Sequence, residues 1–214
     1  AYGKVSVSGC DASKNAMGNV DTATGQGMPP ASAGSAKITS TAKIVAVQKV
    51  NGGGLSSSTP GIISSSSTVY TPFVRYTTSC FAASPAAAVC RGESRQRTFF
   101  AVQNTGGATV KVRMKLYNYK GEEVATLLTA NVLPDAKVSI DPSKATASTG
   151  HTAAELAEFG YAVVSGAVLY SGSAVFESVD PTTLAAASTI GVVARVVSMS
   201  PLGQTGDDYN GTPQ

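Results

Sequence analysis

The chain has 214 residues with a formal net charge of +3, and 14% of them are charged, against about 25% in ordinary soluble domains. The basic residues are scattered and interleave with no aromatic run, which argues against nucleic acid as a partner. An uncharged stretch, residues 159–176, is interrupted by Gly and Ser and reads as two strands rather than a membrane span. Ala, Ser, Thr, Gly and Val replace the missing charge, which favours a β-rich, secreted or polymeric protein. The alternative is an ordinary soluble β-protein with an uncharged surface.

The first 34 residues are predicted to form an N-terminal strand followed by a flexible extension. In the opening AYGKVSVSG, Val5 and Val7 share one face with Gly3 and Gly9, while Lys and Ser face the other way. This strand either belongs to the protein's own sheet or completes the sheet of a neighbouring copy. In the second case Val5 and Val7 would fill pockets on the neighbour, and the two glycines would permit close approach. The small first residue, Ala1, is typical of a signal-peptide cleavage product, although a trimmed chain would begin in the same way.

Residues 35–200 are expected to form one β domain. Its first strand is predicted over residues 36–50 and is closed by a run of glycines. The Ser/Thr-rich segment that follows, residues 55–68, is expected to be exposed and mobile. Another strand is predicted over residues 69–78, and Pro72 within it indicates a sheet edge or a bulge.

The chain contains three cysteines, Cys10, Cys80 and Cys90, which bear on whether the protein forms a disulfide. Cys80 and Cys90 enclose a short segment with Pro85 near its middle, and no nearby His or third Cys offers a metal site. We expect a disulfide between them, which would stabilise the fold by about 3 kcal/mol and require an oxidising compartment. The alternative is two reduced, buried cysteines. Cys10 would then be either buried and free or bonded to another subunit.

The clearest pattern runs from residue 97 to residue 140. A strand over residues 98–104 is followed by a glycine turn and by a strand that alternates without interruption. Its inward positions are Val110, Val112, Met114 and Leu116, and its outward positions are Lys111, Arg113, Lys115 and Tyr117. Two further short strands follow, and a spacing of about ten residues predicts an antiparallel sandwich or barrel. The three cations on one face would be solvated, or would meet acidic groups across the sheet or from another subunit.

One helix is predicted over residues 152–160, where Thr152 and Glu155 form a capping box and Gly160 ends the helix. Three more strands are predicted over residues 161–170, 173–179 and 190–199. Residues 201–214 are rich in Gly and Asp and are expected to form a C-terminal tail without a buried face.

The residues that carry chemistry are few. His151 is the single histidine, lies in a Gly/Thr-rich loop and has no nucleophile-elbow serine to serve, so we expect no enzyme. The paired acids Glu122-Glu123 would point to opposite faces of a strand. The pair Asp207-Asp208 lacks the spacing of a calcium loop, and a solvated turn is expected there. We therefore predict no metal and no cofactor, and Asn210 is a candidate glycosylation site because it begins an Asn-Gly-Thr sequon.

Residues 99–142 combine four features: a strand that ends in Asn-x-Gly, an alternating strand, an aromatic-rich turn with Gly, and a strand leading to Leu-Pro. The positions are, in order, Asn104 with Gly106, residues 110–116, Tyr117 and Tyr119 with Gly121, and Leu133-Pro134. This combination resembles the immunoglobulin-like domains of bacterial and archaeal surface proteins, including the CARDB-type adhesion domains. The family often has Gly soon after the proline, where this chain has Asp135-Ala136. The resemblance implies a scaffold or adhesive role rather than an enzyme, and it carries over no binding residues.

The complete expectation is an all-β protein: an antiparallel immunoglobulin-like β-sandwich with one short helix and an extended N-terminal segment. We expect a secreted, cell-surface structural protein that forms a filament, pilus or surface layer from copies of itself. The alternative is a surface adhesion or carbohydrate-binding module whose partners are surface glycans or other cell-envelope proteins. Such a module would expose a row of aromatic side chains, and the candidates are Tyr70, Tyr76, Tyr117, Tyr119, Tyr161 and Tyr170.

Overall fold

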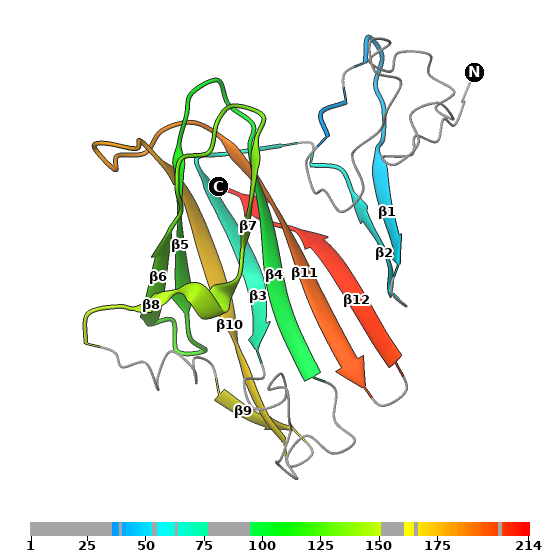
Figure 1. The fold of residues 1–214 in the computed structure, drawn as a ribbon, viewed down its shortest axis with the longest axis vertical. Helices are drawn as coiled ribbons and strands as arrows, with labels where there is room; N and C mark the ends of the chain where they lie inside the picture. Colours follow the sequence, from blue (N-terminus) through cyan, green and yellow to red (C-terminus); the bar gives the residue numbers. More distant parts are fainter. Residues whose placement is uncertain are drawn as a thin grey trace. The chain divides into compact units, whose positions relative to one another are not determined.

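The computed structural model describes residues 36–38, 40–52, 55–62, 64–76, 95–150, 161–164, 167–200 and 203–214. The chain divides into two compact units, Ala1–Lys37 and Ile38–Gln214, and the fold below is that of the second. Its strands are β1 (Val47–Gly52), β2 (Leu55–Pro60), β3 (Thr68–Tyr76), β4 (Arg95–Asn104), β5 (Lys111–Tyr117), β6 (Glu123–Leu128), β7 (Lys137–Ile140), β8 (Thr146–Ala147), β9 (Tyr161–Val164), β10 (Ala167–Val179), β11 (Ile190–Ser200), β12 (Gly203–Asn210) and β13 (Thr212–Pro213) (Figure 1). Within the described residues the single helical segment is a 3-10 turn, η4 (Pro142–Lys144). The protein is all-β, as predicted.

The strands form an antiparallel β-sandwich around one core. One half of the main sheet has the order β12-β11-β4 with β7 beside β4, and the other half has the order β3-β10-β5-β6-β8. The halves join where β3 meets β4 at a single residue pair, Tyr76 and Arg97. Because the sheet folds over on itself, Phe100 of β4 and Phe176 of β10 meet edge to face, with ring centroids 4.7 Å apart. Both side chains are buried in the same core cluster.

The inward and outward positions of β5 follow the predicted alternation. The buried positions are Val110, Val112, Met114 and Leu116, and the half-buried positions are Lys111, Arg113, Lys115 and Tyr117. Burial also alternates along β4 from Arg97 to Asn104 and along β11 from Val192 to Val196. This period of two places one apolar row of each strand in the core, and it is the main reason that these segments form a sandwich.

Asn104 ties together the turn after β4. Its buried side-chain amide donates hydrogen bonds to the carbonyls of Ala108 and Val132, at 2.7 and 3.1 Å, and its Oδ1 accepts one from the Gly106 N–H. The Asn-x-Gly pattern therefore has a physical basis. A buried amide hydrogen-bonds the Gly106 N–H and the Ala108 carbonyl of the turn, and it adds a second hydrogen bond to the Val132 carbonyl, which also accepts one from the Val110 N–H.

Pro72 lies at an irregularity in β3, as its missing N–H suggests. The register between β10 and β3 shifts between Gly172 and Ala174, so that β3 holds one extra residue at this point. Gly172 itself lies within the long strand β10. Consequently the segments predicted as strands over 161–170 and 173–179 are divided differently, into the short β9 and the continuous β10.

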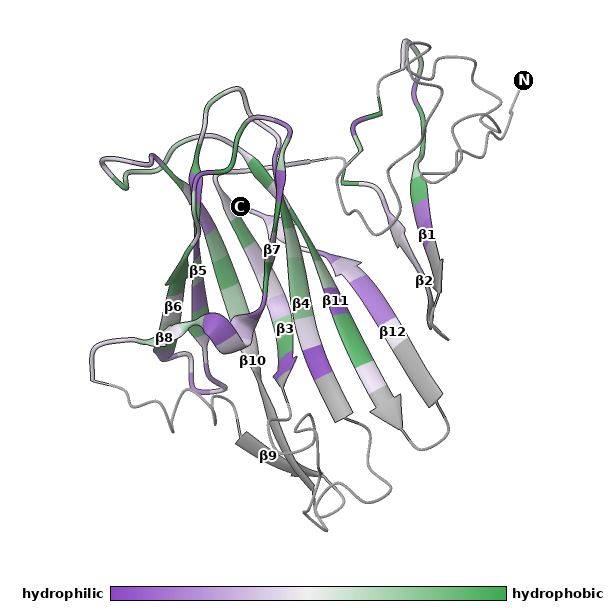
Figure 2. Ribbon diagram, viewed as in Figure 1, coloured by the Kyte–Doolittle hydropathy of each residue, from purple (hydrophilic) through white to green (hydrophobic). Residues whose placement is uncertain are grey.

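Two segments differ from the sequence-based expectation. Residues 55–60, expected to be exposed and mobile, form β2 and pair with β1 in a two-stranded sheet; the strand predicted over 36–50 begins only at Val47. Residues 203–213, expected to belong to a tail, form β12 and β13. Strand β12 pairs with β11 along its whole length, and Tyr209 packs against the core. Backbone pairing rather than an apolar row holds β12 in the sheet, because the part of β12 that is coloured in Figure 2 is predominantly hydrophilic.

The predicted helix over residues 152–160 lies outside the described residues. In the part of the chain that the structure describes, no helix is long and apolar enough to cross a membrane.

Candidate interaction surface on the outer face of β11 and β12

The segment from β2 to Ile62 covers the outer face of β11 and β12. On β11, Ala194 faces the core, so Gly191 and Arg195 face outward. Ile62 packs on Gly191 so closely that a Cβ at this glycine would lie 2.7 Å from Ile62 Cδ1. Further along, the side-chain amide of Asn210 donates a hydrogen bond of 2.9 Å to the Pro60 carbonyl. The segment predicted to be mobile is therefore fitted to this face of the sheet.

A three-residue polar cluster, the Asp208 clamp, holds β2 on this face. The clamp consists of Asp208, Arg195 and Ser57. Arg195 donates from Nε and Nη2 to the two carboxylate oxygens of Asp208, both at 2.7 Å, and Ser57 Oγ donates to Oδ2 at 2.6 Å. The Asp208 side chain is 2% exposed, whereas that of Arg195 is 35% exposed. A nearly buried carboxylate thus accepts three charge-assisted hydrogen bonds, one of which comes from the hairpin.

The electrostatics of the clamp favour its charged form. Burial would raise the pKa of the Asp208 carboxyl, but the hydrogen bonds from Arg195 and Ser57, together with the charge of Arg195, outweigh burial and lower the pKa below its usual value. The hydrogen bond to Asp208 likewise raises the pKa of Arg195. The pair is therefore ionised at neutral pH.

This geometry corrects the expectation for Asp207-Asp208. The two residues lie in a strand rather than a solvated turn, and adjacent strand residues face opposite ways. The carboxylate of Asp208 accepts the hydrogen bonds of the clamp, and Asp207 is exposed. The two carboxylates therefore do not converge on a cation. Within the described residues, no three His, Cys, Asp or Glu side chains gather as a metal site.

An exposed apolar stretch precedes the hairpin. Its large side chains are Ile38, Ile44, Val45 and Val47, and Val45 is 89% exposed. The Ala46 carbonyl accepts a hydrogen bond of 2.9 Å from the Gly61 N–H, which fixes the chain at that point. Strand β1 pairs with β2 on one side, and no other described strand pairs with its second edge. An unpaired edge beside exposed apolar side chains can template pairing with another chain.

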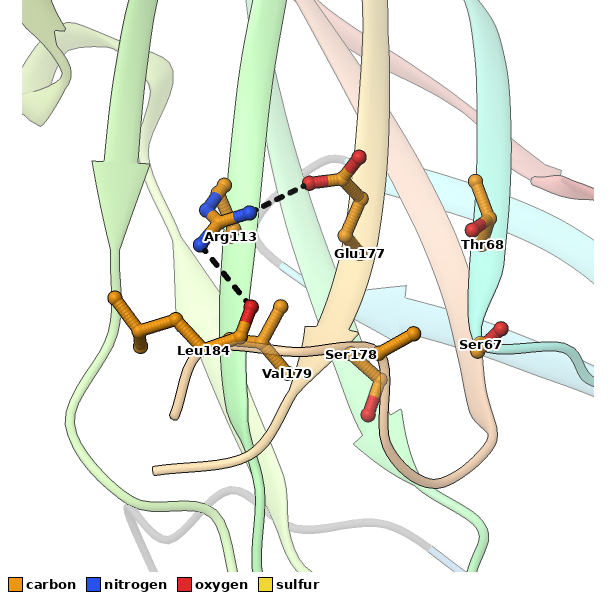
Figure 3. A pocket seen from close by; sticks show the side chains of 8 residues that line it. Ser67, Thr68, Arg113, Glu177, Ser178, Val179 and Leu184 are labelled. Atoms are coloured by element: carbon orange, nitrogen blue, oxygen red, sulfur yellow. Dashed lines mark hydrogen bonds and ion pairs between the residues drawn. The ribbon is translucent and has the colours of Figure 1, made fainter. Parts of the chain in front are cut away.

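A shallow pocket of about 120 Å³ lies on the outer face of the other half of the sheet (Figure 3). At its wall, Arg113 donates to Glu177 at 3.2 Å and to the Leu184 carbonyl at 3.5 Å. Lys115 donates to the second Glu177 oxygen at 3.1 Å. Burial lowers the pKa of Lys115, but Glu177 outweighs it and raises the pKa. Glu177 is therefore the acidic partner that was expected across the sheet from the cations of β5. It forms ion pairs with both Arg113 and Lys115.

Most of the residues proposed from the sequence for function lie outside the described residues. They are Gly3, Val5, Val7, Gly9, Cys10, Cys80, Cys90 and His151, and the predictions about them stay predictions. Asn210 is described at the end of β12, where its amide nitrogen is engaged with Pro60. A glycan would replace one of the two hydrogens on that nitrogen and leave one N–H to donate. Among the tyrosines, Tyr70 and Tyr119 are exposed and Tyr117 is half-buried.

The clamp and the close contact between Gly191 and Ile62 were not predicted from the sequence. Ser57 lies in a run of serines and threonines in which no position is distinguished from the next. Arg195 and Ser57 are 138 positions apart, and only the folded sheet brings them together. The one available signal was Gly191 within an apolar strand, since a glycine there often marks close approach of another segment.

Comparisons with known proteins add no function. No protein-family model matches the chain, and no curated protein matches it. Among solved structures, the crystal structure of Thermotoga maritima 1070 matches with a TM-score of 0.39 and 11% sequence identity, over 70% of this chain and 95% of that chain. At this level the likeness supports no conclusion about fold, family or function.

Proposed function

We propose that the protein is an extracellular structural subunit of a filament, pilus or surface layer, and that copies bind one another through the N-terminal part of the chain. The observation that supports the proposal is the exposed apolar stretch beside the unpaired edge of β1. Apolar side chains in this number are seldom left exposed next to an open strand edge unless another chain covers them.

Strand addition is the interaction that suits this stretch. Val45 and Val47 are two positions apart, so in an extended chain they point to the same side. Both are strongly exposed, whereas Ala46 between them is half-buried beside Gly61. A neighbouring copy would gain main-chain hydrogen bonds from the edge and would bury the two valines in pockets.

The decisive experiment compares two matched variants by negative-stain electron microscopy. Val45→Asp places a charge on the proposed contact, and Leu133→Asp places one on an equally apolar, exposed position elsewhere. We expect filaments or lattices from the parent protein and from Leu133→Asp, and dispersed particles from Val45→Asp. Assemblies of normal length from Val45→Asp, or dispersed particles from the parent protein, would contradict the proposal.

The predicted N-terminal strand is a second proposed contact, and it is tested separately. Deletion of residues 1–10 removes Val5 and Val7 together with both neighbouring glycines. We expect a chain that no longer polymerises, because the strand that completes the sheet of the neighbour is lost. Filaments of normal length from this deletion would reject strand donation by residues 1–10 while leaving the contact at Val45 in place.

An extracellular location is part of the same proposal. It agrees with the low charge and with the expected disulfide between Cys80 and Cys90, which requires an oxidising compartment. Mass spectrometry of unreduced peptides from the native protein tests it. A peptide pair joined through these cysteines supports the location, and two free thiols would argue against it.

A further inference from the structure

We infer that the β1–β2 hairpin is an exchangeable arm: the hairpin of one copy occupies the outer face of β11 and β12 of the next copy. This inference rests on the proposed function, because it adds to the proposed contact at Val45 a second contact that would join the assembled copies. The arm consists of residues 38–62, and its seat is the surface formed by Gly191, Arg195 and Asp208.

The seat is built to hold this particular segment. Asp208 is nearly buried while the hairpin is in place, and its carboxylate takes one of its three hydrogen bonds from Ser57. Gly191 leaves space that Ile62 fills, and a Cβ at position 191 would lie 2.7 Å from Ile62 Cδ1, so Ile62 would have to shift. Without an occupant, the face would expose a hollow and a partly satisfied ion pair. The occupant that fits is the hairpin of this chain, whether it comes from the same copy or from another.

The hairpin is separable from the sandwich. It forms its own two-stranded sheet, and in the described residues no backbone ladder joins it to the main sheet. After Ile62 the chain re-enters the sandwich at Ser66, whose backbone pairs with Ile190 in both directions, at 3.3 and 2.8 Å. Release of the arm at a hinge between Ile62 and Ser66 would therefore leave every described strand pair from β3 to β13 intact.

Exchange would restore every contact that it breaks. The Asp208 clamp, the Asn210–Pro60 hydrogen bond and the Ile62–Gly191 contact would be the same between two copies as within one. Contact energies would then largely cancel, and protein concentration and the conformation of the hinge would set the balance. An isolated two-stranded hairpin is at best marginally stable in water, so a released arm gains stability by binding to a seat. Each copy has one arm and one seat, so head-to-tail exchange can continue without limit and produce a filament.

Cross-linking across the seat separates the two arrangements. In the full chain carrying Ser57→Cys and Asp208→Cys, a short bifunctional thiol reagent joins the hairpin to whichever β12 it occupies. Exchange predicts a ladder of covalent dimers and larger species on a non-reducing gel of the assembled protein, which a cleavable reagent returns to monomer on reduction. Internally linked monomers from assembled protein would overturn the inference. The parent chain and Ser57→Cys alone, treated identically, set the background from the native cysteines.

A second cysteine pair keeps the test valid if loss of Asp208 prevents folding. Pro60→Cys with Asn210→Cys spans the same seat and leaves the Arg195–Asp208 ion pair intact. The proposed function fails if the parent protein forms no assemblies under the microscope. Exchange alone fails if the parent protein assembles and the cysteine pairs give only internal links, because copies then bind one another by another surface.

Discussion

Replacement of Arg195 by Met tests the clamp most directly. Arg195→Met removes two hydrogen bonds of 2.7 Å but keeps an apolar stem that can pack on the sheet. Asp208 would then be a carboxylate that is 2% exposed, with Ser57 as its remaining partner in the clamp. Removal of one partner of a buried pair typically costs about 3–5 kcal/mol. Because Arg195 is 35% exposed, water can reach the vacated position, and we expect a smaller loss of about 2–3 kcal/mol.

The pH dependence of this loss identifies its cause. In the parent protein the pKa of Asp208 is lowered, so its contribution to stability is complete above the unfolded pKa of about 4 and disappears as the pH falls through the folded pKa. In Arg195→Met, burial would raise the same pKa, so protonation at low pH would stabilise the folded variant relative to its unfolded chain. The stability gap between parent and variant should therefore be largest at neutral pH and should narrow below about pH 4.

Urea unfolding at neutral and acidic pH measures the gap, and amide hydrogen exchange of β2 reports whether the hairpin loosens first. Lys144→Met is the control, because it removes an exposed cation and should change stability by less than about 0.5 kcal/mol. The double variant Arg195→Met with Asp208→Leu should be more stable than Arg195→Met alone, since it leaves no buried charge. A loss below about 0.5 kcal/mol in Arg195→Met, or a gap that does not change with pH, would refute the reasoning.

Three further predictions concern other parts of the sheet. Phe176→Ala should lower the free energy of unfolding by about 3–5 kcal/mol in urea, because the ring is fully buried against the facing half of the core; a loss below about 1 kcal/mol would mean that the halves do not pack as described. Gly191→Ala should destabilise the seat by about 1 kcal/mol through its contact with Ile62, and this penalty should shrink in an Ile62→Ala background; additive losses in a double-mutant cycle would contradict the contact. Glu177→Gln should cost about 0.5–1 kcal/mol and lower the pKa of Lys115. Because that pKa is raised in the folded protein, the part of the cost that comes from Lys115 should fade as the pH rises past it, while the part from Arg113 remains; an unshifted Lys115 titration measured by NMR would argue against the pairing.

The sandwich could be predicted because its evidence is local. The alternation of Val112, Met114 and Leu116 with charged residues is visible within a single strand, and it determines which face is buried. Pro72 and Asn104 similarly act through their own backbone neighbourhood, one by lacking an N–H and the other by bonding nearby turn groups.

Strands β2 and β12 could not be predicted for the opposite reason. Both are polar, so no apolar row marks them, and their pairing partners supply the missing stability. The cations of β5 are an intermediate case. Their need for an acidic partner was evident from the sequence, but only the register of β10 against β5 placed Glu177 between Arg113 and Lys115.

By itself the sequence determined that this protein is built from antiparallel strands around one apolar core, because apolar and charged residues alternate along β5 and further short strands follow at a spacing of about ten residues. Only the tertiary structure decided that Ser57, Arg195 and Asp208 form one clamp and that Gly191 is a seat for Ile62. The contacts of Ser57 and of Ile62 with the sheet join residues more than a hundred positions apart, and the polar or small side chains of the clamp and of Gly191 carry no local pattern. Whether these side chains come into contact depends on which strands lie side by side, and that is a property of the folded sheet.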